Sequence, residues 1–175
     1  LLSLIVRYEQ YMFCNNEEDQ YLKLINKILV SGSDRKTRNG NTKGVFGERM
    51  EFDLANGFPL LTTKKMPNRI IFAELLFFMR GLTDTKILED NNVKIWHDNT
   101  TSENINKLHK VLEEYDMGPM YGFQWRHFNA IYNGCHASYT GLGIDQLQNV
   151  IDTIIKEPHS RRMIMTTYNP AQVDQ

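Results

Sequence analysis

The stretch RIIFAELLFFMR, residues 69–80, decides more about the fold than any other part of the chain. Its interior is apolar except for Glu74, and a helix that is apolar on nearly every side is predicted to be buried. A carboxylate in such a helix is costly to ionise unless it is paired, and burial raises its pKa toward the range used in acid–base catalysis. Glu74 is therefore a candidate catalytic residue. The alternatives are a buried ion pair with an arginine and a helix turned so that Glu74 meets water.

Periodic patterns predict further elements on both sides of this helix. Apolar residues at helical spacing indicate helices, and alternating apolar residues indicate strands. The expected elements are helices that begin near Gln20, Thr100 and Asp145, and strands over residues 45–54 and 161–168. The polar stretch SGSDRKTRNGNTKG, residues 31–44, is expected to be a loop. Helices and strands mix without strict alternation, so the predicted fold class is α+β.

The composition is that of an ordinary globular domain. Of the 175 residues, 41% are hydrophobic and 23% are charged, which suffices for a domain with its own core. The net charge of −1 gives no overall attraction to nucleic acid or to an anionic membrane, so we expect neither partner. The opening LLSLIV is too short for a membrane span or a signal peptide. Two cysteines cannot form a disulfide framework, which favours a reducing, cytoplasmic compartment.

Two groups of cations are candidate anion sites. Glycines and arginines in one loop can wrap a phosphate, although a solvated turn is the alternative. The loop over residues 31–44 carries Arg35, Lys36, Arg38 and Lys43. It lacks the glycine spacing and the Lys-Ser/Thr ending of a Walker loop. Arg161 and Arg162 begin a predicted strand and would point to opposite faces, where each can bind an anion or pair with a carboxylate.

The segment GPMYGFQWRHF, residues 118–128, gathers aromatic side chains between glycines and a basic pair. Tyr121 offers a hydroxyl on a rigid ring, which can donate or relay a proton. The alternative is an aromatic core strand, the commoner role of such a cluster. His127 is expected to be a hydrogen-bonded structural histidine rather than a base.

Cys135 and His136 are adjacent, and a neighbouring imidazole can favour a thiolate. Neighbours in sequence need not face each other, and nothing identifies a positioned base, so catalysis by Cys135 is not expected. The histidines and cysteines show no metal-ligand spacing, so we expect no zinc or other metal site.

Six segments together resemble the thymidylate synthase family, in that family's order. They are FPLLTTKK (58–65), RIIFAELLFFMRG (69–81), VKIW (93–96), MGPMYGFQWRHF (117–128), GIDQLQNVID (143–152) and SRRMIM (160–165). The resemblance covers nearly all of residues 20–175. It implies a mixed β-sheet with packed helices, incomplete in this chain. It also implies a methyltransferase that makes dTMP from dUMP with 5,10-methylenetetrahydrofolate as co-substrate.

The resemblance also implies roles for individual residues. Glu74 resembles the carboxylate that works with ordered water on the pyrimidine carbonyl, and Tyr121 resembles the tyrosine associated with removal of the C5 proton. The residues that resemble folate-side positions are Lys64, Ile95, Trp96 and Asn99. Arg38 resembles the loop arginine on the nucleotide phosphate. Arg161 and Arg162 resemble the pair that reaches the phosphate of the other subunit, which implies a homodimer with shared active sites.

The main departure from the family is an absence. The family's nucleophile is a cysteine in a Pro-Cys-His segment, and the 175 residues contain no such segment. Cys135-His136 lacks the proline and lies before the arginine pair, so it is not a displaced copy. We therefore expect this chain alone to be inactive. We also expect it to be prone to aggregation, because apolar faces and sheet edges would stay uncovered.

The expected organisation has two parts. Residues 1–16 are predicted to be a leader or the end of a preceding domain, with a short β-rich piece over 1–13. Residues 17–175 are predicted to be the N-terminal part of a thymidylate synthase domain. The acidic seam at 14–19 followed by QYLKLI resembles the junction in bifunctional dihydrofolate reductase–thymidylate synthases. Two other functions stay open: a pyrimidine hydroxymethylase of the same fold, and a catalytically dead nucleotide-binding relic.

Overall fold

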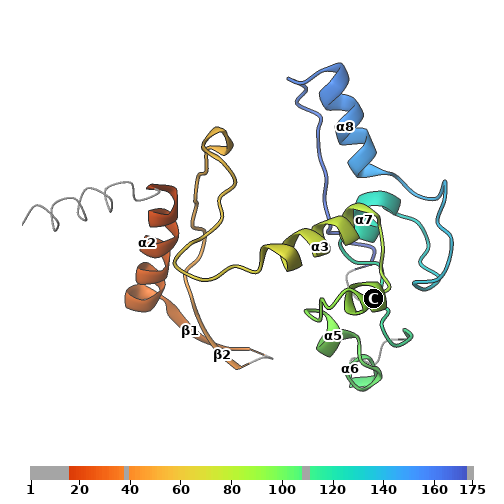
Figure 1. Cartoon of the computed structure of the whole chain (residues 1–175), viewed down its shortest axis with the longest axis horizontal. Helices are drawn as coiled ribbons and strands as arrows, with labels where there is room; N and C mark the ends of the chain where they lie inside the picture. Colours follow the sequence, from red (N-terminus) through yellow and green to blue (C-terminus); the bar gives the residue numbers. More distant parts are fainter. Residues whose placement is uncertain (1–15, 38–39, 108–110, 173–175) are drawn as a thin grey trace, which may run out of the picture. The chain divides into compact units, whose positions relative to one another are not determined.

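The computed structural model describes residues 16–37, 40–107 and 111–172 (Figure 1). The chain forms two compact units, Leu1–Met66 and Pro67–Gln175, and each is described by itself. The predicted β-rich piece at 1–13, Cys14 and Arg38 lie outside the described residues. The division into a leader at 1–16 and a synthase part at 17–175 stays a prediction.

The first unit begins with helix α2 (Asn16–Ser31), which starts earlier than expected because the acidic stretch at 17–19 forms its first turn. Acidic side chains are favourable there, since the N-terminus of a helix carries partial positive charge. The helix ends before Gly32, whose amide donates to the Ile28 carbonyl over 2.9 Å.

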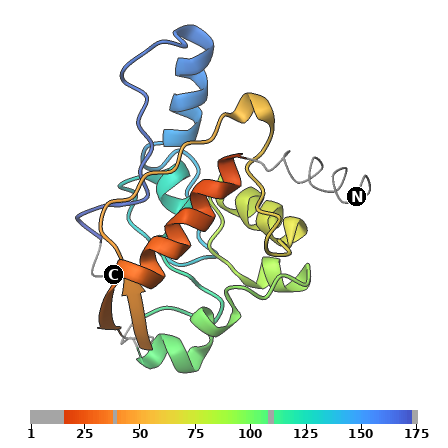
Figure 2. The same ribbon diagram turned by 90° about the vertical axis from the view of Figure 1, so that its left-hand side faces the viewer.

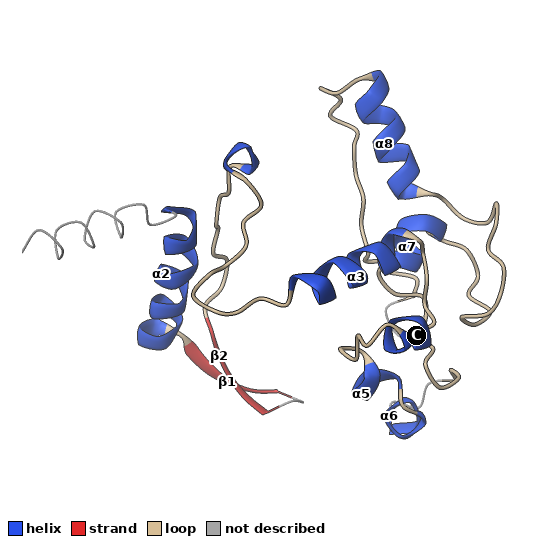
Figure 3. Ribbon diagram, viewed as in Figure 1, coloured by secondary structure: helices blue, strands red, loops and turns tan. Residues whose placement is uncertain are grey.

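A β-hairpin follows α2, where the sequence had predicted a loop. Strands β1 (Ser33–Thr37) and β2 (Gly40–Gly44) pair antiparallel, from Ser33 opposite Gly44 to Thr37 opposite Gly40. Figures 2 and 3 show the two strands as paired arrows directly after α2. The strands are almost wholly exposed, so apolar alternation could not reveal them. Gly40, where β2 begins, has φ +115°, a conformation that favours glycine, and this glycine was the sequence signal for a tight turn.

The predicted strand over residues 45–54 is wrong. The backbone there is irregular and leads into a short 3₁₀ helix, η1 (Leu54–Asn56), where the Asp53 carboxylate accepts the Ala55 amide. Phe46 is 94% exposed, and Leu54 is 71% exposed. The Phe46 and Leu54 side chains are therefore not packed in a core, and no described segment pairs with this stretch of backbone.

Glu18 joins the first turn of α2 to the Thr62–Thr63 segment. Its carboxylate accepts the amide and hydroxyl of Thr62, each over 2.6 Å, and those of Thr63 over 2.8 and 2.9 Å. The Glu18 residue is only 7% exposed. The hydroxyl of Thr62, then the amide of Thr63, lower the pKa of Glu18 from 4.5 to about 2, because these donors stabilise the ionised form. The link fixes the backbone that leads to Lys64.

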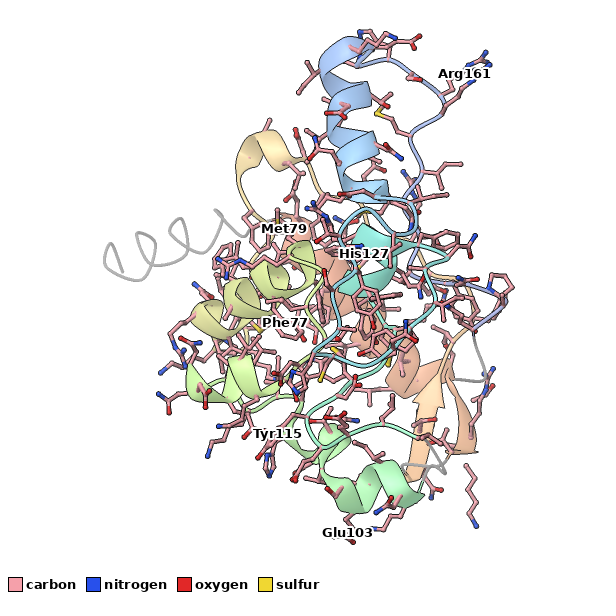
Figure 4. All side chains as sticks on the ribbon, turned by 90° about the vertical axis from the view of Figure 1, so that its right-hand side faces the viewer. Phe77, Met79, Glu103, Tyr115, His127 and Arg161 are labelled. Carbon is pink, nitrogen blue, oxygen red and sulfur yellow. The ribbon has the colours of Figure 1, made fainter. Side chains whose placement is uncertain are left out.

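The second unit consists of short helices joined by loops. They are α3 (Asn68–Met79), α4 (Lys86–Asp90), α5 (His97–Thr100), α6 (Ser102–Lys107), α7 (Gly122–His127) and α8 (Gln146–Lys156). Helix α3 packs against α4 and α7, and α7 also packs against α8. One core cluster contains Phe77, Phe78, Leu88, Val93 and Met117, and a second contains Phe123, Ala130 and Tyr139. Figure 4 shows the Phe77 and Met79 side chains on α3 and His127 on α7.

Two helix predictions in the second unit hold and one needs adjustment. Helix α3 forms as predicted, and α8 begins after Asp145, whose carboxylate accepts the Gln148 amide over 2.9 Å. The helix expected to begin near Thr100 begins two residues later, at Ser102. Thr100 ends α5 and is buried, whereas the hydroxyl of Thr101 accepts the Asn104 amide over 3.4 Å at the start of α6.

Helix α3 is not buried on every side, which corrects the prediction from its composition. Phe77 and Phe78 are buried, but Phe72 and Leu76 are 52% and 50% exposed. The cause is that α4 and α7 pack against only part of the helix surface. No described helix is long and apolar enough to cross a membrane.

The predicted strand at residues 161–168 is also wrong, because this segment is irregular. The aromatic segment at 118–128 contains helix α7 rather than a core strand. Outside the hairpin, β-pairing among the described residues is limited to isolated bridges, Asp84 with Asp116 and Phe128 with Ile144. Helices together with a small antiparallel sheet agree with the α+β class. The larger mixed sheet stays a prediction.

Gly122 permits the closest approach between α3 and α7. A Cβ atom at this position would lie 2.5 Å from the carbonyl oxygen of Phe78 and 2.7 Å from its Cα. Both are backbone atoms, so no side-chain rotation can relieve the contact. Only glycine fits where α7 begins.

We expect the Glu18→Gln variant to lose stability at neutral pH, with a pH dependence that identifies the carboxylate. The pKa of Glu18 is lower in the folded state than in the unfolded state. Its contribution is therefore full above about pH 4.5 and is lost as the pH falls toward about 2. Hydrogen exchange of the Thr62 and Thr63 amides measures this. Asp19→Asn, on the same turn but exposed, is the control; equal protection in both variants would contradict the assignment.

We expect Gly122→Ala to destabilise the protein by about 1–3 kcal/mol, the usual cost of overpacking. The added methyl group must push α7 away from the Phe78 backbone. Denaturant unfolding of the full-length protein measures the loss. Gly44→Ala is the matched control, because nothing lies within 4 Å of a Cβ there. Equal stability of the two variants would show that α7 does not approach α3 this closely.

Candidate functional site

Glu74 is paired with an indole, not with an arginine. The Nε1–H group of Trp96 donates a hydrogen bond to Oε1 of Glu74 over 2.8 Å. Glu74 lies on α3, and Trp96 directly precedes α5. Both side chains are half-buried. A neutral donor orients one carboxylate oxygen without cancelling the charge, and no described residue donates to the other oxygen, Oε2. The carboxylate is thus held in place and can still accept a proton or a hydrogen bond.

Aromatic rings surround this carboxylate pair. The ring of Phe78, one turn after Glu74, stacks on the ring of Tyr121 with 5.1 Å between centroids. Trp96 lies edge-on to Phe78 at 6.3 Å and tilted to Tyr121 at 5.6 Å. Trp125 of α7 adds a second edge contact to Phe78, at 6.1 Å. These spacings are those of favourable aromatic pairs, so the rings hold one another in place.

Tyr121 has an unusual backbone conformation, with φ +37° and ψ −95°. A non-glycine residue with positive φ costs free energy and persists only where its surroundings enforce it. Gly122 on one side must lie against the Phe78 backbone, and the ring stacks on Phe78 itself. The Tyr121 side chain remains 37% exposed. The Tyr121 ring therefore lies beside Trp96 and stays partly accessible to solvent.

Asp116 holds the turn that leads to Tyr121. This carboxylate is 2% exposed; one oxygen accepts the Gly118 amide over 2.7 Å and the Tyr132 hydroxyl over 2.5 Å. The hydroxyl of Tyr132 also contacts Thr83 Oγ1 over 2.8 Å. Burial, then the bond to Asp116, raise the pKa of Tyr132, so the phenol keeps its proton and donates it. Gly118 has φ +77°, which a side chain would disfavour.

Ile95 and Asn99 lie on either side of Trp96 in the sequence. The Ile95 side chain is 45% exposed, and the amide of Asn99 donates to the Trp96 carbonyl over 3.0 Å within the first turn of α5. Both residues are exposed and available to a ligand at the Trp96 ring. The structure therefore brings five predicted residues to one region: Glu74, Ile95, Trp96, Asn99 and Tyr121.

The predicted phosphate residues Arg161 and Arg162 are not brought to this region of the second unit. Arg161 and Arg162 are exposed in the irregular segment after α8. Figure 4 shows Arg161 at the far end of α8, with its side chain directed away from the helix. Neither arginine has an ion-pair partner among the described residues. Lys64 is exposed in the first unit, and Arg38 is not among the residues described.

Cys135 does not have the environment of a nucleophile. Burial, followed by the carboxylates of Asp116, Asp84 and Glu113, raises the pKa of its thiol to about 12. A thiol in such surroundings stays protonated near neutral pH and reacts slowly. His127 makes a structural contact, as expected: its Nδ1 lies 3.3 Å from the Leu142 carbonyl oxygen.

Sequence reasoning missed Phe78 and Asp116 as parts of the site. Phe78 was hidden in an apolar run where every position looks alike. The signal for Asp116 was its place two residues before Gly118, because aspartate often accepts a backbone amide at that spacing.

The comparisons with known proteins agree on one family. Residues 19–175 match the family model described as thymidylate synthase. The chain is 43% identical over 171 residues to a bifunctional dihydrofolate reductase-thymidylate synthase from Paramecium tetraurelia, covering 95% of this chain and 37% of that protein. It is 48% identical over 162 residues to a thymidylate synthase from Candida albicans, covering 89% of this chain and 51% of that protein. It is 46% identical over 164 residues to a thymidylate synthase from Saccharomyces cerevisiae, covering 91% of this chain and 54% of that protein. The chain thus spans between about a third and a half of the relatives' length.

We expect the Trp96 indole N–H to be protected from solvent exchange and shifted by its bond to Glu74. The chain contains two tryptophans, and no described acceptor binds the indole N–H of Trp125. In a ¹⁵N spectrum of the full-length protein, Glu74→Ala should move and deprotect only the Trp96 indole signal. The signal of Trp125 serves as the internal control. An unchanged Trp96 signal would show that the hydrogen bond does not form in solution.

Proposed function

Because the chain belongs to the thymidylate synthase family, we propose that the full-length protein converts dUMP to dTMP by reductive methylation, with 5,10-methylenetetrahydrofolate as co-substrate. The family that six sequence segments indicated is confirmed by the match over residues 19–175. One structural observation supports this proposal in addition to the family match. The carboxylate of Glu74, the indole of Trp96 and the phenol of Tyr121 gather around one buried ring, that of Phe78.

Glu74 is proposed to act on the pyrimidine through an ordered water molecule. Attack of a nucleophile at C6 of dUMP places negative charge on the pyrimidine carbonyl oxygen, and this charge needs hydrogen-bond support. Trp96 holds Oε1 of Glu74, so Oε2 is the oxygen that can hold a water molecule and pass a proton. The aromatic rings restrict solvent on one side of the carboxylate, which strengthens its electrostatic interactions.

Tyr121 is proposed to assist removal of the C5 proton. Its ring is fixed by stacking on Phe78 and by the Gly122 contact, so the position of the hydroxyl is largely determined. Its hydroxyl has no hydrogen-bond partner among the described residues. A phenol that is fixed and accessible can orient a water molecule that takes the proton.

The folate-side residues fit an aromatic, anionic co-substrate. When bound, 5,10-methylenetetrahydrofolate supplies the one-carbon unit and the reducing hydride. Ile95 presents an exposed apolar surface beside the Trp96 ring, on which a flat ring system can pack. Asn99 adds an exposed amide on the first turn of α5. Lys64 is exposed and is proposed to bind the glutamate tail; the Glu18 contacts fix the backbone before it.

The substrate phosphate is proposed to bind arginines from two subunits. A dianionic phosphate is best held by several fixed guanidinium groups. Arg161 and Arg162 are exposed, and the structure gives them no carboxylate partner, so they are available to an anion outside this chain. We propose that they reach the phosphate in a second copy of the protein, within a homodimer. Arg38 is proposed to bind the phosphate of its own subunit.

The nucleophile of this reaction is proposed to be a cysteine outside residues 1–175, in the Pro-Cys-His segment that the family carries. Cys135 is not proposed for this role, since the pKa of its thiol is raised to about 12. The two alternative functions are not favoured, because the matching family and the relatives reported above are thymidylate synthases by name.

We expect the full-length protein to release tritium from [5-³H]dUMP in the presence of 5,10-methylenetetrahydrofolate. Glu74→Gln should lower kcat by about 10²- to 10⁴-fold, the usual contribution of a positioned acid–base group. Trp96→Phe keeps an aromatic ring but removes the donor, and should lower kcat by about tenfold or more. Glu114→Gln, an exposed carboxylate of the same unit, is the control.

The outcomes separate the three functions. Tritium release with dTMP as product supports the proposal, whereas 5-hydroxymethyl-dUMP would identify a hydroxymethylase. Binding of dUMP without tritium release would identify a nucleotide-binding relic. Full activity of Glu74→Gln would contradict the role of the carboxylate but not the overall reaction.

A further inference from the structure

A second group of reactive side chains lies outside the proposed active site. Asp84, Cys135 and His136 each place one possible ligand atom within 4.8 Å of the other two. Glu113 lies beside them, with its Oε2 atom 3.9 Å from Nε2 of His136. From this arrangement we infer that the protein binds a divalent cation of borderline softness, with Zn²⁺ as the best match. This inference does not rest on the proposed synthase activity.

The ligand types select the metal. A thiolate favours zinc over magnesium or calcium, and an imidazole and a carboxylate are its other usual ligands. A cysteine, a histidine and an aspartate supply three ligands and leave a fourth position. The Glu113 carboxylate, whose side chain is 73% exposed, can fill this position, and so can a water molecule.

The backbone on both sides of the cluster is fixed. The amide of Cys135 donates to Asp116 over 3.2 Å, and the carbonyl of Gly134 accepts the Tyr139 hydroxyl over 2.8 Å. That hydroxyl in turn accepts the Asn133 amide over 2.7 Å. On the other side, Asp84 pairs with Asp116 as an isolated β-bridge. Two of the ligands therefore stand on anchored backbone, and the backbone contacts do not involve the Cys135 sulfur.

The third ligand can move to close the site. Zinc bonds of about 2.0–2.3 Å place tetrahedral ligands roughly 3.3–3.8 Å apart. The three ligand atoms here all lie within 4.8 Å of one another, so a small adjustment brings them to that spacing. The His136 side chain is 68% exposed, and its Nδ1 atom lies 3.8 Å from Asp84 Oδ2. This exposed ring is the ligand with the most freedom to adjust its position when a cation binds.

The local charge also favours a cation. The carboxylates of Asp84, Glu113 and Asp116 face the cysteine from three positions. No described lysine or arginine forms an ion pair with any of them. The ammonium of Lys86, two residues after Asp84, is bound to Asp90 instead. The group therefore carries unbalanced negative charge, which a divalent cation would neutralise. Binding would release the thiol proton to solvent, since the thiolate is the ligand.

The spacing of these residues explains why the sequence predicted no metal site. Asp84 and Cys135 are far apart along the chain, and the bridge between Asp84 and Asp116 brings them together. No short ligand motif exists for a pattern search to find. The inference therefore revises the expectation from the sequence, on the ground of the fold.

The test uses the full-length protein without a histidine tag, and Zn²⁺ and Co²⁺ as probes. We expect one Zn²⁺ per chain to compete with a colorimetric chelator. Bound Co²⁺ should give a thiolate charge-transfer band, which reports a cysteine ligand directly. Cys135→Ser should abolish this band, and Cys135→Ser and His136→Asn should each weaken Zn²⁺ binding by more than tenfold. Zn²⁺ should raise the Tm of the unaltered protein but not that of these variants.

Two further variants serve as controls for the loss of a cysteine or a histidine. Cys14→Ser and His159→Asn remove a residue of the same type elsewhere, and both should bind Zn²⁺ like the unaltered protein. Circular dichroism checks that each variant is folded. The inference is overturned if the unaltered protein binds no Zn²⁺. It is also overturned if Cys135→Ser and His136→Asn bind as well as the controls, or if the controls lose binding to the same extent.

Discussion

The contact between the start of α7 and the backbone at the end of α3 is the constraint on which the candidate active site depends. Gly122 lies so close to the Phe78 carbonyl that no side chain fits, and Tyr121, directly before it, has a backbone conformation that tyrosine rarely adopts. The strained backbone sets the Tyr121 ring on Phe78 and beside Trp96. Trp96 in turn holds Glu74. A helix contact made by the backbone thus positions three side chains of the proposed chemistry at once.

Asp116 links the turn before Tyr121 to the loop that carries Cys135. A buried carboxylate is costly unless its oxygens are hydrogen-bonded, and those of Asp116 accept from Gly118, Tyr132 and Cys135. One contact fixes the turn before Tyr121, and another fixes the loop that carries Cys135. The proposed metal cluster and the proposed active site therefore share a structural residue while they differ in chemistry. A metal that stiffens the loop would also stabilise the surroundings of Asp116.

The sequence predicted some elements well and others poorly, for identifiable reasons. Helix α8 was predictable because Asp145 supplies a cap and its apolar residues recur at helical spacing. The hairpin was not, because its strands are polar and exposed, so alternation carries no information. The segments at 45–54 and 161–168 alternate like strands but have no pairing partner among the described residues. Glu74 was predictable as the lone charge in an apolar helix, whereas its indole partner was not. The six segments were also sufficient to identify the family, which the comparisons confirm.

The sequence by itself determined the family, the helix that carries Glu74 and the residue types suited to the reaction, because these depend on local order along the chain. The tertiary structure decided which of those residues meet. It gathered Glu74, Ile95, Trp96, Asn99 and Tyr121 in one region and left Arg161 and Arg162 exposed without a partner. It also brought Asp84 to Cys135 and His136, which no spacing suggested. The physical reason is that hydrogen bonds and ring contacts act over a few ångströms in space, whatever the separation in sequence.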